Sequence, residues 1–362
     1  MTDWTFWMRR ALQLAALGAG RTSPNPLVGC VVLDASGQLV GEGFHAKAGD
    51  AHAEVQALRQ AGERARGSTA VVTLEPCCHH GRTPPCSEAL LRAGIARVVV
   101  AMRDPDPRVS GQGIASLKLS GVPVEEGICA AEARALNRPF LHRLATGRPL
   151  GLLKWAMSAD GRTALPNGSS QWISGPAARS WVHRLRAQCD AVIVGSGTVR
   201  ADNPLLTSRG QRDPEPLRVV ISRSLQLPAE AQLWDQSTAP TLVVHGYDAP
   251  ARRRFQLDAL GVERLVLERC EPEVLMAALA QRGCNQVLWE CGPELAGQAL
   301  RQGCIQQIAA VMAPKLLGGE AARTPLGDLG LSDVQQASTW SSQELQRLGP
   351  DLLWQLQAPI SS

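Results

Sequence analysis

Three short segments in the first half of the chain carry side chains that could bind a metal ion and transfer protons. The segments are His52-Ala53-Glu54, Pro76-Cys77 and Pro85-Cys86. Histidine and cysteine hold zinc in catalytic sites, where three protein ligands leave the fourth position to water. Zinc lowers the pKa of that water to roughly 7, and a nearby carboxylate can then shuttle its protons. The segments therefore predict a hydrolytic zinc site with His52, Cys77 and Cys86 as ligands and Glu54 as the proton shuttle.

The spacing of these residues is close to the pattern typical of zinc nucleobase deaminases, His-x-Glu followed by Pro-Cys-x-x-Cys. Here, however, Cys77 and Cys86 are nine positions apart instead of three. On a regular helix, residues two positions apart point roughly 200° away from each other. We therefore expect His52 and Glu54 at an irregular helix start, before a helix over residues 55–66. Pro84-Pro85 likewise predict that Cys86 begins a helix, whereas Cys77 should lie in a loop after a strand.

The alternative is a structural zinc site with four protein ligands. Cys78, His79 or His80 could supply the fourth ligand, and Glu54 would then take no part in the chemistry. Six further cysteines are interpreted as small buried hydrophobic residues: Cys30, Cys129, Cys189, Cys270, Cys284 and Cys304.

The composition argues against several classes of protein. The formal net charge is +4 and the basic residues are scattered, so no basic block indicates nonspecific nucleic-acid binding. One Tyr and four Phe are too few for a base-stacking platform, and the nine Trp are isolated along the chain. No apolar segment is long enough to span a membrane. Ten cysteines with no secretory signal predict a cytoplasmic protein with free thiols.

The pattern of apolar and helix-forming residues predicts two α/β domains, residues 1–147 and 148–362. A helix is expected over Ala130–Leu144, and Thr146-Gly147-Arg148-Pro149 then precede a new apolar strand. The first domain should contain a helix, a hairpin and then alternating helices and strands, which suits a three-layer α/β/α sandwich. Its strands are expected at residues 28–33, 39–45, 70–74 and 96–101. The second domain should be a doubly wound α/β sheet, with strands at residues 151–157, 191–194, 217–221, 241–244, 264–267 and 286–289.

Two glycine-containing segments of the second domain follow predicted strands. They are Gly195-Ser196-Gly197-Thr198 and Gly292-Pro293-Glu294-Leu295-Ala296-Gly297. Free backbone N–H groups at a helix start or turn favour a phosphate group. For each segment the alternative is a plain turn without a ligand.

Longer motifs extend across both halves of the chain and carry a family resemblance. In the first half they are Thr22-Ser23-Pro24-Asn25-Pro26-Leu27-Val28-Gly29-Cys30, Gly41-Glu42-Gly43-Phe44-His45, the His52 segment and the stretch from Glu75 to Cys86. In the second half they are Lys154 to Arg162, Ser170-Gln171-Trp172-Ile173, Leu185 to Asn203, Gly292 to Gly297 and Ala313 to Gly318. The chain resembles the bifunctional deaminase-reductases of riboflavin biosynthesis. The resemblance covers nearly the whole sequence.

This resemblance implies a fold and a reaction for the first half. The fold would be a cytidine-deaminase-like sandwich. The reaction would be hydrolytic deamination of 2,5-diamino-6-ribosylamino-4(3H)-pyrimidinone 5′-phosphate at one zinc ion per chain. Asn25 and His45 would contact the pyrimidine, and His79 with Arg82 would lie near it. For His45, the alternative is an ordinary surface loop residue.

For the second half, the resemblance implies a dihydrofolate-reductase-like domain that uses NADPH to reduce the ribosyl side chain to ribityl. The cofactor would lie against Ala156, Trp172, Thr198, Asp202, Ser222, Gly292, Pro293, Glu294, Leu295, Ala296, Gly297 and Gln298. Substrate contacts would come from Ser170, Arg186, Leu206, Arg209 and Glu290. Lys154 and Asp202 are the candidates for orienting or protonating the sugar. The guanidinium forks of Arg186 and Arg209 suit phosphate, although Arg186 could instead lie on a solvated helix face.

Two rival functions remain open at this point. The first is a tRNA-editing deaminase with a C-terminal binding domain, which predicts a basic or aromatic groove. The second is a noncatalytic module with a structural zinc and a nucleotide-sensing domain, in which replacing Glu54 would change only stability. The favoured interpretation has a small-molecule substrate, no nucleic-acid or membrane partner, and a homo-oligomer, dimer or tetramer.

Overall fold

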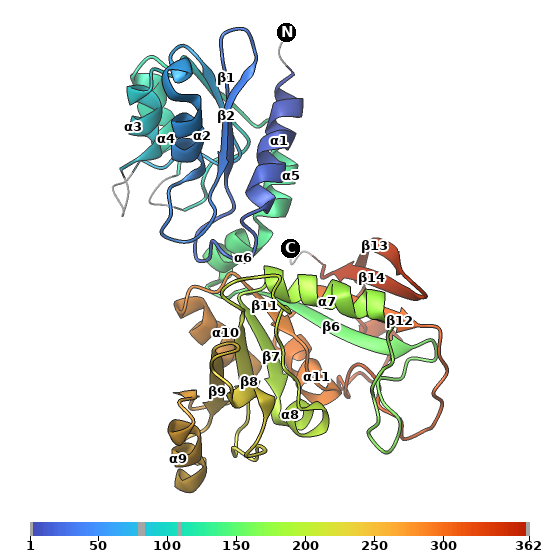
Figure 1. Ribbon diagram of the computed structural model, residues 1–362. Helices are drawn as coiled ribbons and strands as arrows, with labels where there is room; N and C mark the ends of the chain where they lie inside the picture. The colour runs from blue at the N-terminus through green and yellow to red at the C-terminus, as the bar shows by residue number, and fades with distance from the viewer. Residues whose placement is uncertain (1–2, 79–83, 107–109, 360–362) are drawn as a thin grey trace. The chain divides into compact units, whose positions relative to one another are not determined.

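The computed structural model of the chain describes residues 3–78, 84–106 and 110–359. The chain divides into two units, Met1–Gly147 and Arg148–Ser362 (Figure 1). Gly147 ends the last helix of the first unit in a left-handed conformation, with φ of 69°, which is the usual role of a glycine just after a helix. Each unit has its own sheet and is described separately.

The first unit is built on a five-stranded sheet in the order β2-β1-β3-β4-β5. Its strands are β1 (Gly29–Leu33), β2 (Leu39–Phe44), β3 (Thr69–Val72), β4 (Arg97–Val100) and β5 (Val124–Glu126). Strand β1 is antiparallel to β2 and β3, and β3, β4 and β5 are parallel. Strand β5 was not predicted, because Val124-Glu125-Glu126 has only one apolar residue.

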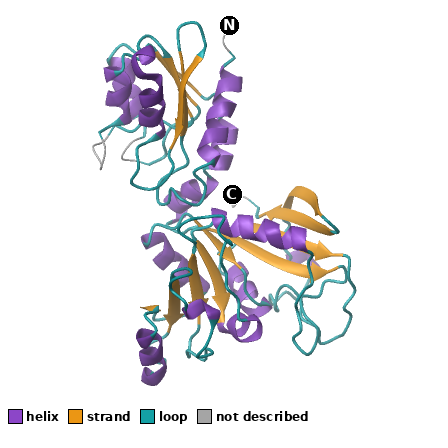
Figure 2. Cartoon of the chain, in the orientation of Figure 1, coloured by secondary structure: helices purple, strands orange, loops and turns teal. Residues whose placement is uncertain are grey.

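Helices cover both faces of this sheet, as Figure 2 shows. On one face lie α1 (Trp4–Ala16) and α5 (Ala130–Leu136), and on the other lie α2 (Ala53–Ala61), α3 (Cys86–Arg92) and α4 (Gln112–Leu119). Two hydrophobic clusters fill the two layers, one with Met8, Val31 and Val71 and the other with Cys30, Val32 and Leu90. The predicted three-layer α/β/α sandwich is confirmed. The predicted helix over residues 55–66 ends in a short 3₁₀ helix, η1 (Gly62–Ala65).

The prediction of one helix over Ala130–Leu144 was wrong. Helix α5 ends at Leu136, and a separate helix, α6 (Arg138–Thr146), begins after Asn137. Pro139 stands at the second position of α6, where its missing N–H breaks no hydrogen bond; in a continuous helix it would. The buried Asn137 side chain instead pairs with the backbone of Leu27, accepting from its N–H at 2.8 Å and donating to its carbonyl at 2.9 Å.

Helix α2 packs directly on the backbone of strand β2. A Cβ atom on Gly41 would lie 2.2 Å from the carbonyl oxygen of Ala57, and one on Gly43 would lie 2.7 Å from that of Ala53. Any side chain at these two positions would push the helix away from the sheet. The glycines therefore fix the position of the helix whose start carries His52 and Glu54.

The second unit contains a nine-stranded sheet in the order β10-β9-β8-β7-β11-β6-β12-β14-β13. The strands are β6 (Leu150–Ser158), β7 (Ala191–Gly195), β8 (Leu217–Ile221), β9 (Thr241–His245), β10 (Glu263–Val266), β11 (Gln286–Trp289), β12 (Gln307–Ala313), β13 (Ser341–Leu348) and β14 (Asp351–Gln357). Seven strands are parallel, and β14 and β13 add an antiparallel edge. The carboxyl ends of the seven parallel strands therefore share one side of the sheet.

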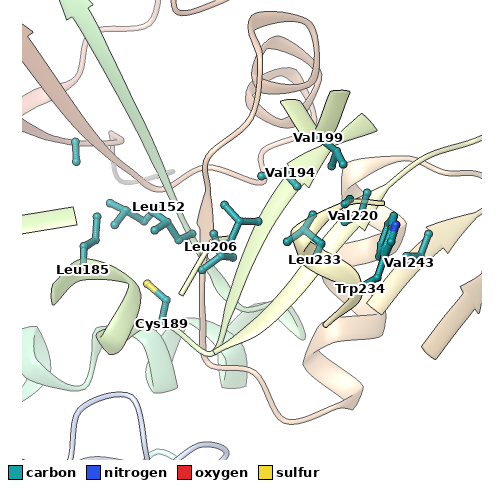
Figure 3. Packing of buried hydrophobic residues seen from close by; sticks show 14 of the residues in the cluster. Leu152, Leu185, Cys189, Val194, Val199, Leu206, Val220, Leu233, Trp234 and Val243 are labelled. Atoms are coloured by element: carbon teal, nitrogen blue, oxygen red, sulfur yellow. The ribbon is translucent and has the colours of Figure 1, made fainter. Parts of the chain in front are cut away.

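Helices lie on both faces of this sheet, so the predicted doubly wound domain is confirmed. One face packs against α7 (Pro176–Gln188), α8 (Ser196–Asp202) and α9 (Ala251–Ala259), and the other against α10 (Pro272–Gln281) and α11 (Pro293–Arg301). Along β7, Val192 and Val194 point to the first face, while Ala191 and Ile193 point to the second. Figure 3 shows part of the first core, where Leu185 and Leu206 join Val194, Val220 and Leu233. Short 3₁₀ helices occur at η2 (Gln232–Trp234) and η3 (Val334–Gln336).

Six of the nine strands were predicted, and the last three along the chain were not. Strand β13 reads Ser-Ser-Gln-Glu-Leu-Gln-Arg-Leu, and all its residues except Leu348 are exposed at the edge of the sheet. It lacks the apolar alternation that marks a half-buried strand. Within the described ranges, no helix is long and apolar enough to cross a membrane.

Replacing Asn137 by alanine should destabilise the first unit by about 1–3 kcal/mol, because it leaves the half-buried N–H and carbonyl of Leu27 without their side-chain partner. Amide hydrogen exchange in β1 and β3 measures this free energy of unfolding. The matched control is Asn167→Ala, which removes an exposed turn hydrogen bond to the Ser169 N–H and should change stability by less than about 0.5 kcal/mol. Equal stability of the Asn137 variant and the wild type would show that the Leu27 pairing is dispensable.

Candidate functional site

The three predicted metal ligands lie together in the first unit. The ligand atoms of His52, Cys77 and Cys86 all lie within 4.8 Å of one another. His52 Nδ1 is 3.2 Å from Cys86 Sγ and 3.6 Å from Cys77 Sγ. One nitrogen and two sulfurs at these separations can surround a single ion.

Two helix starts and one loop bring these ligands together. His52 precedes α2 in an extended conformation, with φ of −68° and ψ of 162°, as expected for an irregular helix start. Cys86 is the first residue of α3, directly after Pro85. Cys77 lies in the loop after β3, and its sulfur accepts a hydrogen bond from the Cys86 N–H at 3.4 Å. The predicted positions of all three residues agree with the structure.

The loop that carries Cys77 is held by the buried carboxylate of Glu75. Glu75 Oε2 accepts hydrogen bonds from the N–H groups of Asp104 at 3.2 Å and Gly111 at 2.9 Å, and Oε1 accepts from Ile114 at 3.1 Å. Helix α4 also approaches the loop so closely that a Cβ atom on Gly113 would lie 1.9 Å from the Pro76 carbonyl oxygen. These contacts fix the backbone next to Cys77, and nothing in the local sequence indicated them.

The electrostatics of the cluster favour a thiolate. Hydrogen bonds from the Cys86 thiol and the His52 ring lower the pKa of Cys77 to about 4, although burial acts in the opposite direction. The same hydrogen bond from Cys86 to Cys77, together with burial, raises the pKa of Cys86. A cation would stabilise both thiolates, because it would replace the shared proton as the partner of the two sulfurs.

Glu54 lies beside the ligands but belongs to no described metal-binding group. Glu54 is only 3% exposed. Burial is the main cause that raises the pKa of its carboxyl group to about 7, and the negative charge of Cys77 adds to this effect. A carboxyl group with a pKa near the working pH can both accept and donate a proton. This geometry fits the predicted proton shuttle.

Asn25 and His45 contact each other next to the metal-binding cluster. Asn25 Nδ2 donates to His45 Nε2 at 3.1 Å, and the ring of His45 stands edge-on to that of His52 at 5.4 Å. His45 is 2% exposed, so the alternative of an ordinary surface loop residue is wrong. His79 and Arg82, which were predicted nearby, lie outside the described residues.

The donor set fits zinc. Two cysteine sulfurs and one imidazole nitrogen are the ligands that borderline-soft zinc takes in three-ligand catalytic sites. Cys78 is not part of the cluster: its Sγ lies 3.8 Å from the side-chain oxygen of Gln112. In the described part of the chain, therefore, Cys78 does not complete a four-ligand structural site.

In the second unit, a buried ion pair joins α7 to the end of β11. Arg186 binds Glu290 through both arms, with Nε to Oε1 at 2.6 Å and Nη2 to Oε2 at 3.0 Å. The two side chains are only 14% and 10% exposed, so Arg186 does not lie on a solvated helix face. Burial tends to raise the pKa of Glu290, but the charge and hydrogen bonds of Arg186 lower it below its usual value.

Lys154 lies on β6, the strand beside β11, and interacts with the same carboxylate. Burial lowers the pKa of Lys154, and Arg186 adds to this effect, whereas the charge of Glu290 opposes it. Lys154 lies in the middle of β6, level with the carboxyl end of β11, and a lysine of lowered pKa there is a candidate proton donor. The structure thus brings three of the predicted reductase residues together.

Two further contacts connect predicted residues of this unit. Ser170 Oγ donates to Asp202 Oδ1 at 3.2 Å, which joins a loop to the last residue of α8. The carbonyl of Trp172 accepts from Lys315 Nζ at 2.6 Å, and the guanidinium of Arg179 lies 4.7 Å from the Trp172 ring centre. The ring itself is 62% exposed, which leaves it free to contact a ligand.

The predicted cofactor residues lie near the carboxyl ends of neighbouring parallel strands. Ala156 is on β6, Thr198 is in the first turn of α8 after β7, and the buried Ser222 follows β8. Gly292 precedes α11, and a Cβ atom there would meet no atom within 4 Å, so the start of this nine-residue helix faces open space. The remaining predicted residues, Pro293 to Gln298, form its first two turns. Free N–H groups at such a start can receive a phosphate.

Leu206 and Arg209 differ in what they can offer a substrate. The Leu206 side chain is 2% exposed and belongs to the hydrophobic core in Figure 3, so only its backbone can contact a polar ligand. Arg209 is exposed, and its side chain is available. Both have positive φ angles, 57° and 59°, which are uncommon outside glycine.

Several residues near the two sites had no role assigned from the sequence. They are Glu75 in the first unit and Arg179, His183, Glu215 and Lys315 in the second. Arg179 and His183 could have been found by their spacing from Arg186, because positions three, four and seven apart share one helix face. Glu75 binds backbone groups of a distant segment, and Glu215 binds N–H groups five and seven positions earlier in its own loop. Neither contact follows a helix or strand period.

Two family models match the chain. Residues 1–102 match the cytidine and deoxycytidylate deaminase zinc-binding region, and residues 149–354 match the RibD C-terminal domain. The metal-binding cluster lies within the first match, and the Arg186–Glu290 pair lies within the second.

The chain is similar to curated and solved proteins over nearly its whole length. It is 49% identical to riboflavin biosynthesis protein RibD of Synechocystis over 347 residues, covering 96% of this chain and 94% of that protein. It superimposes on a solved RibD structure from Acinetobacter baumannii with a TM-score of 0.89 and 42% identity, covering 99% of both chains. A second solved structure, from Thermotoga maritima, gives a TM-score of 0.88 at 32% identity over 98% of this chain and 99% of that one. That protein is described as a diaminohydroxyphosphoribosylaminopyrimidine deaminase and 5-amino-6-(5-phosphoribosylamino)uracil reductase.

Metal analysis should find one zinc per chain, and Cys86→Ser should remove it, because a serine hydroxyl is a poor zinc ligand. Cys78→Ser is the matched control and should keep the full zinc content. Loss of zinc from the Cys78 variant would instead support a four-ligand structural site.

In metal-free protein, Glu54 should make the stability of the first unit fall as pH rises. The pKa of Glu54 is about 7 in the folded protein and 4.5 as the usual value, so the unfolded chain loses the proton at lower pH than the folded protein does. The free energy of unfolding therefore falls as pH rises from 4.5 to 7, and it stays lowered above pH 7. Glu54→Gln removes a penalty on the order of 3 kcal/mol at pH 8 and none at pH 4.

Hydrogen exchange in β1 and β3 at several pH values measures this difference between variant and wild type. Taking the difference cancels the opposite pH dependence of Cys77, which both proteins share. The control is Glu63→Gln, at an exposed position. Parallel pH profiles for Glu54→Gln and wild type would contradict the raised pKa.

Proposed function

Because this chain belongs to the RibD family, whose members are bifunctional deaminase-reductases of riboflavin biosynthesis, we propose which residues carry each reaction. The first unit deaminates 2,5-diamino-6-ribosylamino-4(3H)-pyrimidinone 5′-phosphate by hydrolysis. The second reduces the ribosyl side chain of the product to ribityl with NADPH. The observation that carries the proposal is the grouping of His52, Cys77 and Cys86 around a buried carboxylate that is not itself a ligand.

In the deaminase site, His52, Cys77 and Cys86 hold zinc. Zinc bound there supplies an activated water by lowering its pKa to roughly 7. Glu54 accepts a proton at its carboxylate and returns it to the amine nitrogen, which then leaves as ammonia. Its pKa near 7 suits both steps, because the group neither holds nor releases a proton too strongly at neutral pH.

Asn25 and His45 orient the pyrimidine next to Glu54. The Asn25 amide nitrogen donates to His45 Nε2 at 3.1 Å, which holds the two side chains together beside the metal-binding cluster. By resemblance to the family, we also assign His79 a substrate-binding role. Burial lowers the pKa of His45, which keeps the ring neutral and able to accept from Asn25.

In the reductase site, NADPH supplies the hydride. Lys154 and Asp202 orient the opened sugar, and Lys154, whose pKa is lowered by burial, donates a proton to the sugar oxygen. Glu290 holds Lys154 in place through its charge and binds the substrate together with Ser170 and the backbone of Leu206. Arg209 provides a cation for the substrate phosphate.

The cofactor lies along the carboxyl ends of β6, β11, β7 and β8. Gly292 to Gln298 offer the free N–H groups at the start of α11, and Thr198, Asp202 and Ser222 line the neighbouring strand ends. Ala156 and the exposed ring of Trp172 contact its apolar parts. Dinucleotides commonly bind at this edge of open parallel sheets.

The proposal includes a cytoplasmic protein that forms a homo-oligomer, a dimer or a tetramer. It does not include a tRNA-editing deaminase, because the region that such an enzyme would need for a binding domain matches the RibD C-terminal domain. Light scattering on the purified chain measures the oligomeric state.

The test follows ammonia release and NADPH absorbance in one zinc-loaded sample supplied with the pyrimidinone phosphate. Wild type should release ammonia and then oxidise an equal amount of NADPH. Glu54→Gln should keep its zinc but lower the rate of ammonia release by about 10²–10⁴-fold, because general acid–base catalysis is lost. The control is Glu63→Gln, which should behave like wild type.

The outcomes separate the two halves of the proposal. Ammonia without NADPH oxidation would leave the deaminase in place and refute the reductase assignment. Absence of ammonia from zinc-loaded wild type would refute the substrate. Full activity of Glu54→Gln would refute the role of the carboxylate.

A further inference from the structure

The fork of Arg186 is already occupied by protein groups. Its Nε and Nη2 bind the two oxygens of Glu290 at 2.6 and 3.0 Å, and its Nη1 donates to the carbonyl of Thr207 at 3.0 Å. A bidentate arginine–carboxylate pair that is this buried is costly to break. Three of its five N–H groups are thus used by protein acceptors, and Arg186 links α7, the end of β11 and the loop before Arg209.

Helix α7 turns two more basic residues to the same side as Arg186. Arg179 and His183 precede Arg186 by seven and three positions, which places all three on one helix face. Arg179 is held at one end by its hydrogen bond to the Ser174 carbonyl at 2.7 Å and by its position over Trp172. Arg186 is held at the other end by Glu290. His183 lies between two fixed neighbours.

His183 is half-buried, and its ring makes no hydrogen bond to any residue within the described ranges. Its charged neighbours include three arginines, Arg179, Arg186 and Arg209, and one carboxylate, Glu290. Burial and the arginines lower the pKa of His183, while Glu290 opposes them. The surroundings of the ring thus carry an excess of positive charge that favours an anion.

Hydrogen bonds hold the backbone of the loop that carries Arg209. Glu215 accepts from the Ser208 N–H at 2.6 Å and from the Gly210 N–H at 3.1 Å, on either side of Arg209. The Thr207 carbonyl is held by Arg186. These contacts maintain Arg209 at a φ of 59°, a conformation that costs energy for a residue with a side chain. Its own guanidinium remains exposed.

We propose that His183 is a substrate-binding residue of the reductase, which donates a hydrogen bond to the 5′-phosphate of the ribosyl substrate together with Arg209. Arg186 positions both through Glu290 and Thr207. A phosphate monoester carries nearly two negative charges at pH 7 and fits an imidazole and a guanidinium that form no ion pair with a described residue. The inference rests on the proposed reductase function.

Steady-state kinetics of NADPH oxidation test this role. His183→Leu should raise KM for the phosphorylated substrate about tenfold or more and change kcat less than about twofold, because it removes one hydrogen bond to a charged group. The KM for the same substrate without its phosphate should not change. His183→Gln, which keeps an N–H donor, should recover part of the lost affinity.

Inorganic phosphate serves as an independent probe. It should inhibit wild type competitively, and His183→Leu should raise its inhibition constant by a factor similar to that for KM. Calorimetry of inorganic phosphate binding measures the same loss without turnover, so it still tests His183 if wild type oxidises no NADPH and the proposed function fails. Unchanged ammonia release by the first unit shows that the variant protein is intact.

Arg184→Gln is the matched control. Arg184 lies on the same helix beside His183, but it is exposed and its Nη1 is 3.3 Å from Ser180 Oγ, away from the site. Removing its full positive charge should leave KM and phosphate binding unchanged.

Three outcomes would overturn the proposal. The first is unchanged KM and phosphate inhibition in His183→Leu. The second is a fall in kcat at constant KM, which would indicate a role in the chemistry or in structure. The third is a rise in KM for NADPH alone, which would assign this position to the phosphate of the cofactor.

Discussion

The close packing of helix α2 on strand β2 determines where the metal-binding site of the first unit forms. Gly41 and Gly43 let the backbone of α2 contact the strand directly. This contact fixes the distance from the sheet to the helix start, where His52 and Glu54 lie. The other two ligands depend on this position, because Cys77 and Cys86 come from separate segments and must reach the same nitrogen. Glu75 and Gly113 hold the Cys77 loop for that purpose.

In the second unit, an ion pair rather than close backbone packing holds the site residues in position. Parallel strands bring their carboxyl ends to one edge, and this places Lys154 on β6 beside Glu290 after β11. The Arg186–Glu290 pair then ties a helix and a loop to that edge. Burying such a pair gives little net stability, but it holds its groups in one geometry, which a binding site requires.

The sequence predicted best where function depends on neighbouring residues. His52, Glu54, Cys77 and Cys86 follow short motifs, and Pro85 marks the helix start that positions one of them. The sequence predicted less where residues far apart must meet. Arg186 was predicted as a phosphate ligand, but its contact with Glu290, 104 positions away, could not be predicted from either local sequence.

Secondary structure was missed for physical reasons that can be named. Asn137 and Pro139 interrupt a helix whose apolar pattern continues across them. Strands β12 to β14 were missed as well, and β13 in particular is polar along its length because it lies at an exposed edge. In each case the tertiary surroundings outweighed the local pattern.

The break at Asn137 has a consequence for how this catalytic module can be divided. The segment matched as a deaminase zinc-binding region ends at residue 102, but the loop with Asn25 is supported from beyond it. Asn137 pairs with the Leu27 backbone, and Arg143 donates to the Pro24 carbonyl at 2.8 Å. A recombinant domain that ended at residue 102 would keep all three predicted metal ligands. It would lose the contacts of Asn137 and Arg143 with the loop that carries Asn25. A separately produced deaminase domain that keeps these contacts therefore includes α5 and α6.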